Sequence, residues 1–579
     1  HTKVLNDIVV DVPAESQVHH QMVRKDAEHH DIDINPLVRL YYVEVQEPDM
    51  HDPSGDLRRL LNALEADWQL LDLSYDVALL ATIQPILREG KWAVTVAVRQ
   101  GEQIVAIWPG LKESVFGVAV DVGSTTIAAH LCNLSSGEVV ASAGVMNPQI
   151  RFGEDLMSRV SYVMMNPGGE VDMTRVVREA LNGLVKDLVK QVQCETSDIL
   201  EITFVANPIM HHLLLGINPV ELGGAPFALA TDMSVNTLAG DLDIALNPQA
   251  RAYLLPCIAG HVGADTAGMV LAEEPYNHDE MTLLVDVGTN AEIVLGNRHR
   301  LVACSSPTGP AFEGAQISSG QRAAAGAIER VRIDPVTLEP RFQVIGCELW
   351  SDQAGFDEAT EKSGITGICG SGIIEVVAEM YLSGVINQDG VVDGAMADVN
   401  PRIQPDGRTF SYEIMPATES RGAVKIMQND IRAIQLAKAA LYAGVKLLMQ
   451  YQQVEKVDRI RFAGAFGSHI DVKYAMVLGL IPDCAIDEVS SAGNAAGTGA
   501  RIALLNQESR AEIEQVVRGV EKIETAVEPD FQQLFIDAMA FPNKVDAFPE
   551  LKKVVTLPPI KEVKAETETG EKKRRRRRN

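Results

Sequence analysis

Two short segments of this chain combine a carboxylate, a glycine and small polar side chains at the same spacing. Asp121 to Thr126 reads Asp-Val-Gly-Ser-Thr-Thr, and Asp286 to Asn290, 165 residues later, reads Asp-Val-Gly-Thr-Asn. Glycine lets backbone N–H groups approach a phosphate, hydroxyls donate to its oxygens, and a carboxylate binds Mg²⁺ or its water shell. Two such loops that face each other would hold a nucleotide triphosphate from both sides.

Both segments lie in the same kind of sequence neighbourhood. An apolar run leads into each (115–120 and 283–285), and a second strand-like run follows (127–131 and 291–295). This pattern predicts a β-hairpin whose tip carries the carboxylate. A single Asp-X-Gly is usually ordinary turn chemistry, but repetition of the whole strand–turn–strand unit favours a phosphate site.

Length and composition predict a protein of several domains. The 579 residues are 46% hydrophobic, which is enough for large cores and about three or four domains. No apolar stretch approaches the ~18 residues of a membrane span, and the start resembles no secretory signal, so we expect a cytoplasmic protein without membrane association. Because the sequence begins with His1 rather than Met, we expect a fragment of a longer chain.

The cysteines show no spacing typical of metal or cluster ligands. Their dispersal argues against a zinc ribbon, a locally ligated iron–sulfur cluster and a disulfide framework, and favours reduced thiols that are mostly buried. The seven are Cys132, Cys194, Cys257, Cys304, Cys347, Cys369 and Cys484.

Net charge argues against nucleic acid as a partner of the folded body, since the formal charge is −28. The exception is the end of the chain, where Lys572 and Lys573 precede the arginines 574–578. This tail is either a solvated disordered segment or an electrostatic docking element for an acidic partner or RNA.

The order of the remaining motifs resembles one superfamily. A phosphate hairpin, a small-residue helix at 263–268, a second phosphate hairpin, a glycine-rich strand–helix turn at 464–468 and a final small-residue helix at 493–499 follow one another. Over roughly residues 113 to 505 this order resembles the ATPase superfamily of actin, sugar kinases and heat-shock chaperones. The resemblance implies an α/β fold, an actin-like two-subdomain ATPase built from duplicated ribonuclease-H-like units, preceded by a small α+β middle domain.

The residue sequences of several motifs narrow the resemblance to the reductive activators of corrinoid proteins. Asn147-Pro148-Gln149, Phe152 to Asp155, Pro307 to Gly314, Ile365 to Gly372 and Gly464 to Asp471 carry it. The resemblance implies ATP turnover with Mg²⁺ that couples to electron transfer and returns a Co(II) corrinoid protein to Co(I). It also implies a corrinoid protein partner, an electron donor, a homodimer, and an N-terminal [2Fe-2S] ferredoxin-like domain whose ligand cysteines this chain lacks.

The resemblance also implies roles for individual residues. Asp121 and Asp286 would hold Mg²⁺ and act in catalysis. Asp265 is either a helix cap or the group that orients the attacking water. Glu313 would contact ribose or adenine. The other cofactor-binding candidates are Gly123, Ser124, Thr125, Thr126, Gly288, Thr289, Asn290, Gly370, Ser371, Gly372, Gly464, Ala465, Phe466 and Gly467.

These elements divide the chain into expected units. They are a linker (1–30), the middle domain (31–112), two ATPase subdomains (113–275 and 276–505, the second with the hinge helices), a C-terminal helical extension (506–557) and a disordered basic tail (558–579). We expect helices at 74–88, 153–165, 173–192, 373–382, 426–451 and throughout 510–540.

Two other functions remain open at this stage. A small-molecule kinase of the same superfamily would need an acceptor pocket between the subdomains. A chaperone-like interaction ATPase would need a substrate-binding β-domain after residue 505, and only about 75 residues follow, so the sequence disfavours it.

Overall fold

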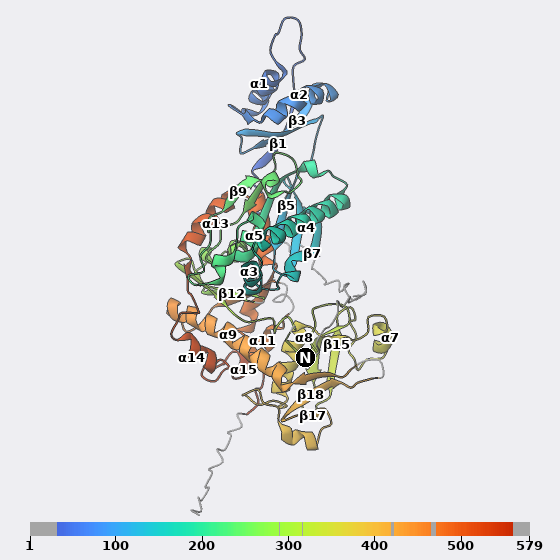
Figure 1. Cartoon of the computed structure of the whole chain (residues 1–579), viewed down its shortest axis with the longest axis vertical. Helices are drawn as coiled ribbons and strands as arrows, with labels where there is room; N and C mark the ends of the chain where they lie inside the picture. Colours follow the sequence, from blue (N-terminus) through green and yellow to red (C-terminus); the bar gives the residue numbers. More distant parts are fainter. Residues whose placement is uncertain (1–31, 289, 315, 419–421, 465–469, 560–579) are drawn as a thin grey trace, which may run out of the picture.

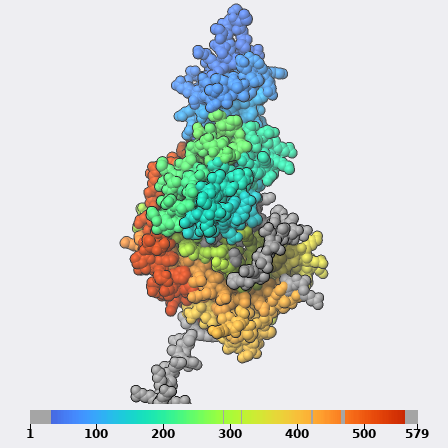
Figure 2. Space-filling model, viewed as in Figure 1, coloured from blue at the N-terminus to red at the C-terminus, as the bar shows by residue number. Residues whose placement is uncertain are grey.

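A computed structural model of the chain describes residues 32–288, 290–314, 316–418, 422–464 and 470–559. The molecule is elongated, and its units are stacked along the long axis (Figure 1). A small N-terminal unit stands at one end, the first large sheet lies next to it, and the second large sheet with its insertions forms the other end. Figure 2 shows the same stack in space-filling form.

The small unit is a mixed sheet packed against two helices. Its strand order is β1-β3-β4-β2, and apolar side chains such as Leu60, Leu64 and Val96 fill the space below the helices. The Asp76 side chain caps the second helix, which therefore begins three residues later than the sequence predicted. The elements are β1 (Val38–Glu44), α1 (Asp56–Trp68), β2 (Ser74–Tyr75), α2 (Val77–Glu89), β3 (Ala93–Arg99) and β4 (Gln103–Pro109).

The first large sheet has the order β7-β6-β5-β8-β10-β9. An antiparallel meander forms one half, and β8 and β10 continue it in parallel with β5. All eight residues of β8 are buried, as expected of a strand covered on both faces. The strands are β5 (Phe116–Val122), β6 (Thr126–Asn133), β7 (Val139–Met146), β8 (Ile199–Ala206), β9 (Val235–Leu238) and β10 (Arg251–Leu254); the helices are α3 (Leu156–Met165), α4 (Gly169–Val192) and α5 (Pro208–Leu215).

The second large sheet repeats this topology. Its order is β21-β20-β11-β12-β13-β22, so an antiparallel meander is again continued by parallel strands. The predicted duplication and the α/β fold class are therefore confirmed. The elements are β11 (Thr282–Val287), β12 (Ala291–Asn297), β13 (Arg300–Ser306), α9 (Gln428–Gln452), β20 (Arg459–Ala463), β21 (Val489–Gly493) and β22 (Glu521–Lys522).

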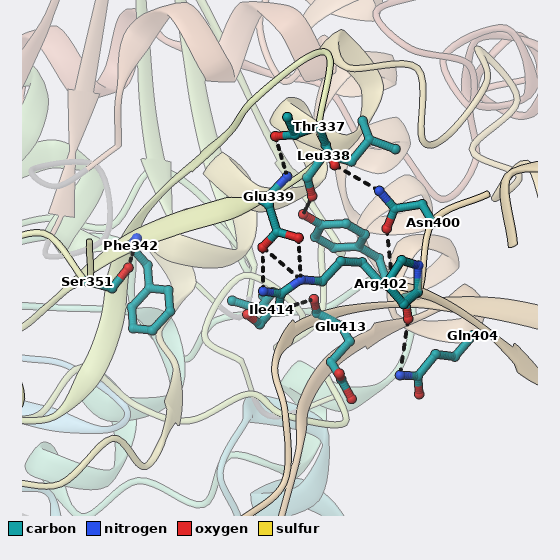
Figure 3. A network of polar contacts seen from close by, with 12 residues as sticks. Thr337, Leu338, Glu339, Phe342, Ser351, Asn400, Arg402, Gln404, Glu413 and Ile414 are labelled. Atoms are coloured by element: carbon teal, nitrogen blue, oxygen red, sulfur yellow. Dashed lines mark hydrogen bonds and ion pairs between the residues drawn. The ribbon is translucent and has the colours of Figure 1, made fainter.

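Two three-stranded sheets are inserted between β13 and α9. Their orders are β15-β14-β16 and β17-β18-β19. Polar contacts join them: Arg402 donates to both carboxylate oxygens of Glu339, at 2.5 and 3.3 Å, and the Tyr412 hydroxyl donates to the Leu338 carbonyl (Figure 3). The elements are β14 (Ala327–Ile333), β15 (Pro340–Val344), α7 (Phe356–Thr360), β16 (Gly367–Ile368), α8 (Gly370–Leu382), β17 (Ile403–Asp406), β18 (Thr409–Met415) and β19 (Val424–Met427).

Two small-residue helices cross between the large sheets. They are α6 (Ala264–Glu273) and α12 (Ala495–Leu505). A Cβ built on Gly499 would lie 2.1 Å from the Gly268 carbonyl oxygen, and one on Gly268 would lie 2.9 Å from that of Ala496. The backbones are therefore in direct contact, which confirms the predicted close crossing of these helices.

The C-terminal extension is less helical than the sequence predicted. The expected helix over 510–540 is interrupted, because Glu521 and Lys522 form β22 and pair in parallel with Val302 and Ala303 of β13. Tertiary pairing overrides helix propensity here. Besides α12, the α-helices described after β20 are α11 (Val472–Leu478), α13 (Gln507–Gly519), α14 (Phe531–Asp537) and α15 (Leu551–Val554).

Two general properties of the described residues bear on function. None of their helices is both long enough and apolar enough to cross a membrane. All seven cysteines are free thiols, either buried or of intermediate exposure.

Candidate nucleotide site

The first Asp-Val-Gly segment forms the predicted hairpin turn. Asp121 ends β5, and the Gly123 N–H donates to the Thr126 carbonyl at 3.0 Å, which closes the tip. A Cβ on Gly123 would lie 2.7 Å from that same carbonyl, so the tight turn leaves no room for a side chain. Ser124 and Thr125 occupy the tip, and Thr126 begins β6.

Three side chains outside the turn hold it in place. The Asn147 amide donates to the Gly123 carbonyl at 2.8 Å, and the Arg159 guanidinium donates to the Ser124 carbonyl at 2.5 Å. The Asn207 amide donates to the Ser124 hydroxyl at 2.7 Å, while its other side-chain atom caps α5. Because Asn207 is the donor, the Ser124 hydroxyl hydrogen stays available for a ligand oxygen.

The second segment forms a matching turn. The Gly288 N–H donates to the Asn290 carbonyl at 3.0 Å, and the Thr308 hydroxyl donates to the Gly288 carbonyl at 3.1 Å. Thr308 thus braces the second turn as Asn147 braces the first. The two related units share the brace as well as the hairpin.

Gly464 lies directly beside the second carboxylate. It follows β20, where Ala463 pairs with Asp286, and its φ is +79°. A Cβ at this position would be 2.2 Å from Oδ1 of Asp286. A glycine is therefore required both by the left-handed backbone and by the closeness of the carboxylate.

The carboxylates of the two halves lie within electrostatic range of one another. Burial, then the negative charges of Asp265 and Asp286, raise the pKa of Asp121 to about 7. Burial and Asp265 likewise raise the pKa of Asp286 to about 7. All three retain partial exposure to solvent. A shared negative site that a ligand can reach is therefore built from β5, β11 and the start of α6.

Asp265 holds a position at the base of the crossing helices. Its Oδ1 accepts the Thr266 N–H at 2.7 Å in the first turn of α6. Burial raises its pKa to about 6, although these local hydrogen bonds favour the charged form. Gly263 occupies the N-cap position of α6 and no side chain makes a cap hydrogen bond there, so the predicted capping role of Asp265 is wrong. The charge of Asp265 acts on Asp121 and Asp286.

A fourth carboxylate, which was not predicted from the sequence, lies beside Asp286. Glu292 lies in β12 directly opposite Asp286, and its Oε1 accepts the Ser305 hydroxyl at 3.4 Å. Burial, Asp265 and Asp286 raise its pKa well above the usual range. The signal available in the sequence was a glutamate between the apolar residues Ala291 and Ile293, on a strand predicted to pair with the Asp286 strand.

The donor set fits a magnesium ion bound together with a nucleotide. Among the described residues, no three His, Cys, Asp or Glu side chains are placed to hold one metal ion by themselves. Mg²⁺ usually keeps several waters and takes one or two carboxylates plus phosphate oxygens. Asp121 and Asp286 would supply the protein side of that shell, and the ion would neutralise the clustered negative charge.

The structure places the other site candidates as follows. Glu313 lies in a turn, where its backbone N–H donates to the Pro310 carbonyl. Gly370, Ser371 and Gly372 form the first turn of α8, where a Cβ on Gly372 would be 2.4 Å from the Ile328 carbonyl oxygen. Thr289, Ala465, Phe466 and Gly467 lie outside the described residues.

Family comparisons account for nearly the whole chain. Successive segments match the RACo linker region (27–114), the RACo middle region (116–278) and the C-terminal domain of RACo, described as the ASKHA domain (280–552). The corrinoid activation enzyme RamQ of Eubacterium limosum is 31% identical over 529 residues, which cover 89% of this chain and 85% of that protein. The chain belongs to the RACo family of corrinoid activators.

Further relatives agree with this membership. The [Co(II) methylated amine-specific corrinoid protein] reductase of Methanosarcina barkeri is 22% identical over 470 residues, 78% of this chain and 82% of its own. The solved structure of a reductive activator for corrinoid, iron-sulfur protein has a TM-score of 0.77 and 31% identity, covering 92% of this chain and 85% of that one. The chain is therefore an enzyme of corrinoid activation with an actin-like ATPase fold, as its motifs predicted.

Proposed function

We propose that this RACo-family chain binds Mg²⁺ and ATP between its two Asp-Val-Gly hairpins and hydrolyses ATP to drive reduction of a corrinoid protein from Co(II) to Co(I). The observation that carries the proposal is that Asp121 and Asp286 end the first strands of two matching hairpins, in halves of the fold that the backbone contact of α6 and α12 joins. The charge of Asp286 also contributes to the raised pKa of Asp121. Site geometry supports the nucleotide, and the relatives support the corrinoid protein.

Each turn would contribute backbone N–H groups and hydroxyls to the phosphates. Asp121 and Asp286 would hold the water shell of Mg²⁺, and Mg²⁺ would neutralise charge on the phosphate oxygens. Asp265, at the start of the crossing helix, would orient the attacking water. Because α6 and α12 are in backbone contact, a change in the distance between the turns would pass to both helices.

The reduction adds one electron to the cobalt, and the electron comes from outside the nucleotide site. The seven thiols are dispersed, so this chain's own cysteines do not form a cluster-ligand set. We propose a [2Fe-2S] ferredoxin-type domain as the donor, as the family resemblance implied. ATP hydrolysis would supply the free energy for the uphill transfer.

We further propose that the expected units act as separate parts. The unit at 31–112 would stand between the electron-donor domain and the ATPase, the regions 113–275 and 276–505 would close on ATP, and the extension at 506–557 would support the second sheet. Free thiols favour the cytoplasm, and the family resemblance favours a homodimer.

The direct test combines hydrolysis with corrinoid spectroscopy. Purified chain, Mg²⁺, ATP, a low-potential reductant with a [2Fe-2S] mediator, and a Co(II) corrinoid protein should give Co(I) absorbance only when ATP is present. Asp286→Asn should abolish the formation of Co(I) in the presence of ATP. Co(I) formation at the same rate without ATP would contradict the proposal, as would faster phosphorylation of a small-molecule acceptor than release of phosphate.

A further inference from the structure

A second polar site lies away from the hairpins, where the small N-terminal unit meets the first large sheet (Figure 1). A cavity of about 400 Å³ opens there. All of its lining residues are polar or charged, and they come from both the small unit and the first large sheet. They are Ser74, Arg99, Gln100, Glu102 and Gln103 of the small unit, and Asn236 and Arg251 of β9 and β10.

Beside this cavity, one buried carboxylate already has two arginine partners. Glu201 of β8 is 1% exposed, and its two oxygens form ion pairs with Arg99 and with Arg510, the latter at 3.1 Å. Arg99 comes from β3 of the small unit and Arg510 from α13. Glu201 thus joins three parts of the chain, and neither oxygen remains free of a guanidinium.

A third arginine has no such partner. Arg251 of β10 lies opposite Glu201 of β8 in the parallel register, so the two side chains leave the sheet on the same face. Within the described part of the chain, Arg251 forms no ion pair, and it lines the cavity instead. Its positive charge reaches Arg99: burial, then Arg510 and Arg251, lower the pKa of Arg99 to about 9.

We propose that this cavity binds a small oxyanion of the phosphate class. Arg251 would form the charged fork with its oxygens, and the amides of Asn236 and Gln103 would donate from the two sides. The anion would neutralise the charge of Arg251, which forms no ion pair within the described part of the chain and lines the cavity. Glu102, which also lines the cavity, would repel an anion and weaken binding.

Binding would strengthen the junction between the small unit and the ATPase. That junction already contains the Lys112–Asp198 ion pair at 2.8 Å and the bond from the Asn35 N–H to the Leu505 carbonyl at 2.8 Å. Because Leu505 ends α12, the small unit is tied to the hinge helix. An anion across the cavity would therefore restrain how the small unit follows the movement of α12. This inference stands apart from the proposed ATP chemistry.

The test is isothermal titration of inorganic phosphate into the whole chain. The protein is first saturated with Mg²⁺ and a non-hydrolysable ATP analogue, so that the nucleotide site is filled, and chloride at matched ionic strength is the blank. We expect one phosphate per chain. Arg251→Gln should weaken binding by about tenfold or more, and Glu102→Gln should strengthen it.

The controls separate loss of the site from loss of the fold. Arg251→Gln should bind the ATP analogue as the unaltered chain does, and phosphate should raise the Tm of the unaltered chain more than that of this variant. Equal phosphate affinity in both proteins, no heat of binding up to about 10 mM phosphate, or tighter binding of malonate than of phosphate would each overturn the proposal.

Discussion

At the scale of single residues, the site depends on carboxylates that repel one another until a cation joins them. Asp121, Asp265, Asp286 and Glu292 each have a raised pKa with burial as the first cause. Such clustering costs folding free energy, so it is expected at a functional site rather than in a structural core. Neutralising one of these carboxylates by substitution should therefore lower the rate of ATP hydrolysis and raise the stability of the fold.

Asp286→Asn should reduce ATP hydrolysis by about 100-fold or more, because the Mg²⁺ shell loses one of its two carboxylates. The same change relieves repulsion with Asp265, so the Tm should stay level or rise. Steady-state phosphate release and thermal unfolding measure both effects. Asp279→Asn, at an exposed ion pair with Arg298, is the matched control and should leave both unchanged. Normal hydrolysis in Asp286→Asn would remove this carboxylate from the mechanism.

Asn207→Asp tests the direction of the hydrogen bond between the side chains of residue 207 and Ser124, which lies in the first turn. The aspartate would still cap α5 through the Met210 N–H, but it would accept a hydrogen bond from the Ser124 hydroxyl instead of donating one. The hydroxyl would then be turned from the phosphate, and a negative charge would be added nearby. We expect the KM for ATP to rise about tenfold with little change in Tm. An unchanged KM would show that Ser124 does not donate to the nucleotide.

At the scale of elements, the crossing of α6 and α12 fixes the distance between the two sheets. Gly268 and Gly499 bring the helix backbones into contact, and Asp265 stands in the first turn of α6. Any side chain at the crossing would force the helices apart. The hairpins that end β5 and β11 would then separate as well.

Gly499→Ala should destabilise the protein by about 1–3 kcal/mol, because the new methyl group overlaps the Gly268 carbonyl. Gly183→Ala is the matched control: it lies on an exposed face of α4 with open space around it, so alanine should stabilise by about 0.5–1 kcal/mol. Denaturant unfolding of both variants measures the difference. If Gly499→Ala is as stable as the unaltered chain, the helices do not cross at backbone contact.

At the scale of the whole molecule, stability should carry a pH dependence from buried histidines. Burial, aided by the charge of Arg501, lowers the pKa of His130 to about 4. Between pH 6.5 and 4 the unfolded chain binds a proton at this histidine that the folded chain does not, so stability falls as pH falls. Asp121 and Asp286 act in the opposite sense, since their raised pKa values favour the folded state on acidification.

The histidine contribution is isolated by His130→Gln. Between pH 6.5 and 4, the slope of its unfolding free energy against pH should be smaller than that of the unaltered chain by up to about 1.4 kcal/mol per pH unit. Urea titrations at several pH values measure the slopes. Parallel curves for the two proteins would show that His130 is protonated equally when folded and unfolded.

Much of this architecture was predictable because local sequence encodes it. Both Asp-Val-Gly turns, their flanking strands and the small-residue helices depend on patterns that a few residues carry. Glu292, Arg159 and Asn207 were missed, because their importance arises only when strands pair and helices pack. The wrong helix over 510–540 has the same cause: only the pairing with β13 makes Glu521 and Lys522 a strand.

The central claim is that Asp121 and Asp286 serve one nucleotide, and a double-mutant cycle tests it most directly. Titration of Mg²⁺ with a non-hydrolysable ATP analogue gives Kd for the unaltered chain, Asp121→Asn, Asp286→Asn and the double variant. We predict non-additive losses, with a coupling of about 1 kcal/mol or more, because both carboxylates hold the same ion. Strictly additive losses, or no loss in either single variant, would contradict the claim.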